Sequence, residues 1–70
     1  MIAKVDILEM ENLMEINDIT NSDLSVEADL CIKTIDRILT EGTATLKSII
    51  KISIVLKCSI RDILLKTEMI

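Results

Sequence analysis

The chain has 70 residues, and a domain of this length buries only about 60% of the surface that its unfolded chain exposes, so its core is small. Half of the residues are apolar, but Phe, Trp and Tyr are absent, which leaves Ile, Leu, Val and Met to build that core. The longest apolar runs have three residues, far below the roughly 20 that cross a bilayer, and the acidic start does not resemble a signal peptide. We therefore expect one domain, residues 1–70, with no membrane partner.

The net charge of −4 is unevenly distributed along the chain. Residues 1–30 carry eight acids and one base, for a net charge of −7, whereas residues 31–70 carry seven bases and four acids, for +3. A chain divided in this way can have one basic face despite its acidic total. The net charge alone therefore does not exclude a nucleic acid partner.

The sequence offers little material for catalysis or for binding metals and cofactors. Cys31 and Cys58 have neither metal-ligand nor redox spacing, and there is no histidine. We interpret both as free thiols of a reducing compartment, which predicts a cytoplasmic protein. A phosphate-binding glycine loop and a carboxylate pair placed for acid-base chemistry are also missing, so we expect no enzyme, no cofactor and no metal.

The first half of the chain predicts two helices. Residues 5–17 have apolar side chains on more than one helical face, which indicates a helix buried over a wide arc. The stretch NDITNSD that follows is rich in residues that favour turns and caps. Thr20, with Asp23 three residues later, predicts the N-cap of a second, short helix over about 21–27.

A third helix is predicted over about 30–40. Its apolar positions leave polar side chains on an outward face, whose members are Lys33, Asp36, Arg37 and Thr40. Gly42 is the only glycine, and it stands where a helix ending near Thr40 needs a left-handed residue. It predicts the end of this helix.

Two periods compete in the stretch TATLKSIIKISIVLKCS, residues 43–59. Ile50, Ile52 and Ile54 alternate with polar residues as in a strand, while other apolar residues keep helical spacing. Because a lone strand in a helical chain has no partner, we predict a helix over about 44–57, capped by Thr45. Ser59 predicts the cap of a last helix over about 60–67.

The stretch TNSDLSVEADLCIKTIDRIL, residues 20–39, resembles the helix-turn-helix of the Xre/Cro, lambda-repressor-like DNA-binding domains. The usual run of that family is Thr-Gln-x-Glu-Leu-Ala, a Gly-Val-Ser turn, and x-x-Thr-Ile-x-x-Ile. The matching positions hold Thr20, Leu24, Thr34, Ile35 and Ile38, with Asp23 in place of Glu and Ser25 in place of Ala. The stretch IIKISIVLKCSIRDIL, residues 49–64, is similar to the family's Leu-Leu-Lys-Ile-Ala-x-Ala-Leu-x-Val-Ser-x-x-Asp-Leu-Leu. The resemblance implies an all-α, five-helix domain with a helix-turn-helix over about 20–40.

The resemblance also implies a partner, double-stranded DNA, and roles for particular side chains. The third helix would lie in the major groove, with base edges facing Ile32, Lys33, Asp36 and Arg37. Contacts to the DNA backbone would come from Asn21, Thr40, Thr43 and Lys47. The implied function is a small homodimeric transcriptional regulator, most simply a repressor, on an inverted-repeat operator.

Asp29, Cys31 and Cys58 also depart from the family's pattern. Asp29 stands where the turn often needs a glycine with positive φ, a conformation that Asp tolerates better than most residues. Cys31 replaces the Ser or Thr that usually begins the third helix, and a thiol caps poorly. A helix N-terminus beside Lys33 could make Cys31 a redox switch, although an unactivated thiol is the commoner case. Cys58 takes a buried Val position, which predicts a small core residue.

A surplus of apolar residues predicts a homodimer. Ile54 stands where the family has a polar residue, and the apolar tail LLKTEMI adds to it. The predicted interface consists of Ile54, Ile63, Leu65, Met69 and Ile70. The alternative function is a protein-interaction module with a helix-turn-helix fold, such as an antirepressor or an antitoxin-like partner, and the acidic first half of the chain favours it.

Overall fold

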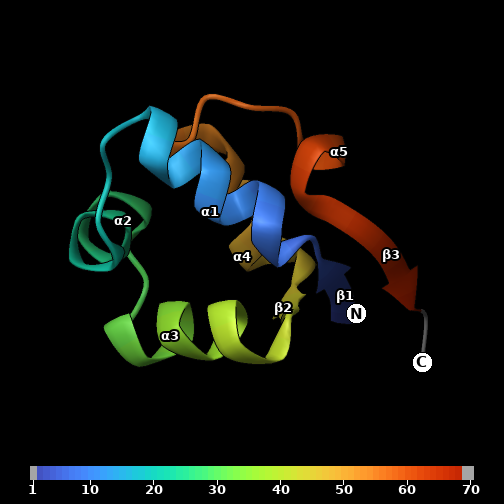
Figure 1. Cartoon of the computed structure of the whole chain (residues 1–70). Helices are drawn as coiled ribbons and strands as arrows, with labels where there is room; N and C mark the ends of the chain where they lie inside the picture. The colour runs from blue at the N-terminus through green and yellow to red at the C-terminus, as the bar shows by residue number, and fades with distance from the viewer. Residues whose placement is uncertain (1, 69–70) are drawn as a thin grey trace.

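The computed structural model describes residues 2–68, which form five helices and three strands. In chain order these elements are β1 (Ile2–Val5), α1 (Ile7–Ile16), α2 (Asn21–Ala28), α3 (Ile32–Glu41), β2 (Thr43–Thr45), α4 (Leu46–Val55), α5 (Ile60–Ile63) and β3 (Leu64–Glu68). Figure 1 shows the strands at one end of the molecule and α2 at the other. The prediction of five helices is confirmed, but the prediction of an all-α chain is wrong.

The three strands form an antiparallel sheet in the order β2-β1-β3. Lys4 of β1 pairs with Thr43 of β2 on one side and with Lys66 of β3 on the other. The side chains of β1 alternate, so that Ala3 and Val5 are buried while their neighbours are exposed. The sheet therefore joins segments from both ends and the middle of the described chain.

Strand pairing also explains two wrong helix boundaries. The first helix begins at Ile7 and not at residue 5, because Val5 belongs to β1 and Asp6 is the N-cap, whose carboxylate accepts a 3.2 Å hydrogen bond from the Glu9 amide. The last helix, predicted over 60–67, ends at Ile63, because Leu64 has extended backbone and starts the strand that pairs with β1.

A third boundary is also wrong, because the helix predicted over 44–57 is α4, Leu46–Val55, and Thr43–Thr45 pair with β1 as strand β2. The predicted capping residues are confirmed. Thr20 and Asp23 form a capping box at the start of α2, and the Thr45 hydroxyl caps α4 by accepting from the Ser48 amide. Gly42 ends α3 with φ +72°, and a Cβ at this position would lie 3.1 Å from the Ile7 side chain. Both the conformation and the space at Gly42 thus favour glycine.

The core is aliphatic and draws on all five helices. Its fully buried large side chains are Met10, Leu24, Ile35, Ile38, Ile49, Ile52, Leu56 and Ile63. The prediction that Ile63 lies in a dimer interface is wrong, because its side chain is 0% exposed in its own chain. Ile54 and Leu65 are 71% and 64% exposed, and Met69 and Ile70 lie outside the described residues.

Asp29 has the left-handed conformation predicted for the turn, with φ +55° and ψ +47°. Because Asp is strained there and Gly is not, Asp29→Gly is expected to raise the free energy of unfolding by about 0.5–1 kcal/mol, measured by urea denaturation. The control is Glu27→Gly inside α2, which should lower the free energy of unfolding by roughly 0.5–1 kcal/mol. Equal losses in both variants would contradict a strained Asp29.

Candidate functional site

The turn between α2 and α3 is held by Ser25. The Leu30 amide donates a 2.9 Å hydrogen bond to the Ser25 carbonyl, and the Ser25 hydroxyl donates to the Leu30 carbonyl. Both bonds cross the turn that Asp29 opens with its positive φ. The angle between the two helices is therefore fixed by backbone and side-chain hydrogen bonds together.

The orientation of α3 is fixed by its buried side. Ile35 and Ile38 of α3 lie in the same core as Leu24 and Ala28 of α2, and none of the four is more than 4% exposed. With these positions inside, the opposite side of α3 faces away from the protein. The predicted outward face is confirmed, because its members, Lys33, Asp36, Arg37 and Thr40, are exposed. Ile32 beside them is also exposed.

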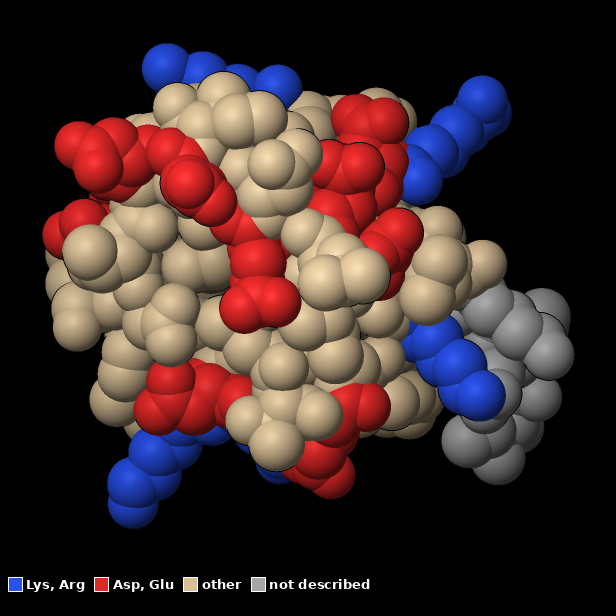
Figure 2. Space-filling view, in the orientation of Figure 1, with Lys and Arg blue, Asp and Glu red and all other residues tan. Residues whose placement is uncertain are grey.

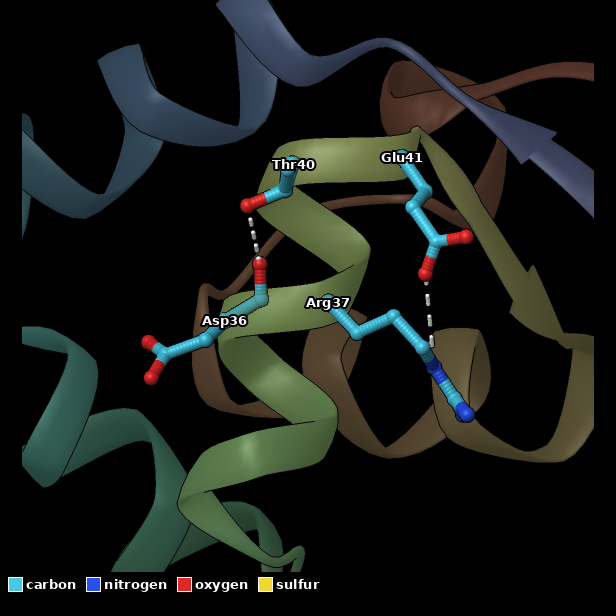
Figure 3. Close-up of polar contacts among 4 residues, drawn as sticks. All are labelled: Asp36, Arg37, Thr40 and Glu41. Atoms are coloured by element: carbon cyan, nitrogen blue, oxygen red, sulfur yellow. Dashed lines mark hydrogen bonds and ion pairs between the residues drawn. The ribbon is translucent and has the colours of Figure 1, made fainter.

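The start of α2 contacts this face through one hydrogen bond. Asn21 donates from its side-chain amide to Asp36 Oδ1 over 3.3 Å, although both residues are exposed. Figure 3 shows the Asp36 carboxylate pointing to one side of α3 and the Arg37 side chain to the other. Asn21, predicted to contact the DNA backbone, thus has a partner within the chain and orients Asp36.

Arg37 has only a loose partner. Its Nε lies 3.9 Å from Glu41 Oε2, and the two side chains are 64% and 58% exposed (Figure 3). An exposed pair of this kind contributes little to stability, so another anion can displace Glu41. The Thr40 hydroxyl donates to the Asp36 carbonyl over 2.7 Å, within its own helix. Of the polar groups on this face, the Arg37 guanidinium can most easily leave its partner, Glu41, for a ligand's anionic group.

A shallow hollow of about 240 Å³ lies where α3 ends against the sheet. Its lining is Ile2, Arg37, Glu41, Thr43, Ala44 and Thr45. It brings together two predicted contact residues, Arg37 and Thr43, while Lys47 is exposed in the first turn of α4. Sequence reasoning missed Glu41 here, although its position four residues after Arg37 was a signal for this pair.

The electrostatic balance of the α3 surface is neutral. Lys33 and Arg37 are offset by Asp36 and Glu41, all four exposed. Figure 2 shows acidic side chains spread over the face that α1 and α2 present, with basic side chains near its outline. The surface of α3 therefore differs from the acidic face without being strongly basic.

A larger hollow of about 450 Å³ lies between the end of α1, the helix α2 and the end of α4. Its lining is Asn17, Asp18, Ile19, Asp23, Val26, Glu27, Val55 and Lys57. Asn17 connects the end of α1 to the end of α4, because its side-chain amide donates hydrogen bonds to the Leu13 and Leu56 carbonyls. Sequence reasoning missed this hollow, because its lining comes from three separate segments.

The two cysteines have different surroundings. Cys31 is exposed at the start of α3 and makes no capping hydrogen bond, as predicted for a thiol. Cys58 is half-buried against the core, and burial raises the pKa of its thiol, with further contributions from the carboxylates of Asp62 and Glu9. Within residues 2–68, no His, Cys, Asp and Glu side chains gather in a group of three that could hold a metal ion.

The raised pKa of Cys58 predicts a stability that falls at alkaline pH. Above about pH 9 the unfolded chain loses this thiol proton while the folded chain keeps it, so the free energy of unfolding decreases as pH rises toward the folded-state pKa. Cys58→Val should remove this part of the decrease as the pH rises above the ordinary thiol pKa of about 8.5, measured by urea denaturation, whereas Cys31→Ser should keep it. Identical pH profiles for the native chain and Cys58→Val would contradict the prediction.

The described helices include none that is both long and apolar enough to cross a membrane. No family model matches the chain, and neither a curated protein nor a solved structure matches it.

Proposed function

We propose that the protein is a sequence-specific, double-stranded DNA-binding regulator of the Xre/Cro type. The observation that carries the proposal is the α2–α3 unit: two helices joined by a hydrogen-bonded turn with a positive-φ residue, the second of them exposing one whole side. A helix held in this way can enter a major groove while the preceding helix crosses the DNA backbone. A cytoplasmic location, where free thiols persist, belongs to the same proposal.

The side chains on α3 supply the groups that read bases. Lys33 and Arg37 can donate to O6 and N7 of guanine, and Ile32 can contact a thymine methyl group. Asp36 can accept from cytosine N4, and the hydrogen bond from Asn21 keeps its carboxylate directed. On binding, the Arg37 guanidinium exchanges Glu41 for a base or a phosphate.

The neutral balance of this surface has a consequence for specificity. Two basic side chains offset by two carboxylates neutralise few DNA phosphates. The affinity for DNA of arbitrary sequence is therefore low and depends weakly on salt concentration. Asp36 and Glu41 repel phosphates wherever the base contacts do not form. The proposed regulator thus binds mainly where the sequence is correct.

The proposed operator is an inverted repeat bound by a homodimer. Two copies related by a two-fold axis place their α3 helices in half-sites about 34 Å apart on one side of the duplex. Of the side chains predicted for the contact between copies, Ile54 and Leu65 remain as exposed apolar candidates. A bound dimer would act by excluding or recruiting polymerase, most simply as a repressor.

The test is a selection from randomised duplexes at low salt, followed by sequencing of the bound pool. The native chain should enrich a palindrome, and the Lys33→Ala/Arg37→Ala variant should not. Circular dichroism of the variant checks that the fold is intact. Absence of enrichment with the native chain would refute the proposal.

A second candidate function, a protein-interaction module, is favoured by the larger hollow. Ile19, Val26 and Val55 give it apolar walls, and Asp18 and Glu27 give it negative charge. An antirepressor or antitoxin-like partner presenting an aliphatic side chain among basic residues would fit this chemistry. Failure of the duplex selection, together with a partner whose binding is lost in Val26→Asp, would favour this function over DNA binding.

A further inference from the structure

The outward face of α1 combines exposed aliphatic side chains with carboxylates. Leu8 and Ile16 are 80% and 69% exposed, although both are large and apolar. Glu11 and Glu15, four residues apart, lie on the same side of the helix and are also exposed. Such a face on a surface helix is typical of a contact with another protein.

The outward face of α4 has the same pattern with the opposite charge. Ile50 and Ile54 are 41% and 71% exposed, and Lys47 and Lys51 lie beside them at the same spacing of four residues. Within the described residues, neither ammonium group has an ion pair. The pair of lysines therefore matches the pair of glutamates on α1 in spacing and complements it in charge.

We propose that α1 of one copy docks on α4 of a second copy. Glu11 and Glu15 then face Lys47 and Lys51 across the contact, and the four aliphatic side chains of the two helices pack between and beside the ion pairs. Charge complementarity selects this partner, because each face carries like charges that oppose its pairing with itself. The contact uses no base-facing residue of α3. It shares Lys47 with the proposed contacts to the DNA backbone and Ile54 with the proposed two-fold dimer, so it forms between copies that are not bound to DNA.

The placement of the two helices determines what this contact builds. In Figure 1, α1 lies toward the viewer and α4 lies behind it, so their outward faces point to different sides of the molecule. A contact between different faces is heterologous, and each copy in it keeps one face of each kind for further neighbours. Association through α1 and α4 therefore continues beyond the dimer as protein concentration rises.

The test uses two charge-reversed variants in the absence of DNA. Glu11→Lys/Glu15→Lys makes both faces basic, and Lys47→Glu/Lys51→Glu makes both acidic. Sedimentation equilibrium of the native chain at low salt should show a mean mass that rises with concentration past that of a dimer. Each variant alone should associate about tenfold or more weakly, because like charges now meet.

The decisive measurement is the equimolar mixture of the two variants. Each face then finds an opposite charge on the other variant, so the mixture should associate like the native chain. This rescue also shows that neither variant has lost its fold. A native chain that stays monomeric or stops at a dimer, or a mixture that associates no better than its components, would overturn the proposal.

Two further variants separate this contact from other causes. Leu8→Ser should weaken association of the native chain, because it removes an aliphatic side chain from the contact. Lys33→Ala/Arg37→Ala should leave association unchanged even if DNA binding is lost, which keeps the test of this contact distinct from the test of the proposed function. Loss of association in the α3 variant would contradict the assignment to α1 and α4.

Discussion

Ile63→Ala is expected to lower the free energy of unfolding by about 2–5 kcal/mol. Ile63 is completely buried, and it lies in α5, which contacts both α1 and α4. Truncation leaves a cavity in a core that contains no aromatic side chain to fill it. A domain of this size has a total stability of roughly 4–10 kcal/mol, so the variant is close to unfolding at room temperature.

The control for this prediction is Ile54→Ala, which removes the same atoms from a side chain that is 71% exposed. It should change the free energy of unfolding by no more than about 0.5 kcal/mol at protein concentrations where the chain is monomeric. Urea denaturation at two concentrations measures both variants. A loss in Ile63→Ala that disappears on dilution would mean that Ile63 supports a contact between copies, as the sequence had suggested.

Substituting Lys33 and Arg37 together is expected to abolish specific DNA binding. Each side chain that contacts a base is worth about 1–3 kcal/mol, which corresponds to roughly 5- to 150-fold in affinity for the selected operator. Because α3 has no other Lys or Arg on its outward face, the variant leaves the negative charges of Asp36 and Glu41 without a compensating positive charge. Fluorescence anisotropy with a labelled operator should show affinity reduced to that for unrelated duplexes.

Lys47→Ala is the matched control, since Lys47 is a candidate for a phosphate contact and not a base contact. It should weaken binding to all duplexes by a similar factor and reduce the slope of log affinity against log salt by about 1. The α3 variant should instead remove the preference for the operator. Equal loss of operator preference in both variants would contradict a reading role for α3.

The local signals in the sequence predicted the five helices, although not every boundary. The ends of α2 and α3 follow from single residues, because Thr20, Asp29 and Gly42 each have a chemistry suited to one terminal conformation. The outward face of α3 followed from periodicity, because apolar positions at helical spacing leave only one side for charged residues. These features depend on neighbours within a few residues, which a sequence displays directly.

The sheet could not be predicted because its pairing is non-local. β1 has only four residues, and its two partner strands begin far away in the sequence, at Thr43 and Leu64. Each of these short segments alone gives no strand signal. The apolar tail was therefore attributed to a helix and a dimer interface. The described part of this tail, Leu64–Glu68, is instead the strand β3, and Ile63 directly before it is buried in the core.

Sequence periodicity predicted that Lys33, Asp36 and Arg37 are exposed on the outward face of α3, and this exposure is confirmed. It did not show that Asn21 contacts Asp36 or that Ser25 holds the turn. Both contacts join residues on different helices or across a turn. They depend on the angle between α2 and α3, which only the folded chain fixes.

The pairing of β1 with β3 is expected to slow the folding of the chain. Ile2 lies opposite Glu68, so the register of this pair closes nearly the whole described chain into one loop. Helical turns form within about a microsecond, whereas contacts between residues this distant must wait for a costly loop closure. The helices are thus expected to assemble first and β3 to add last. A stopped-flow experiment would then show slower refolding than is typical of a bundle built from local contacts alone.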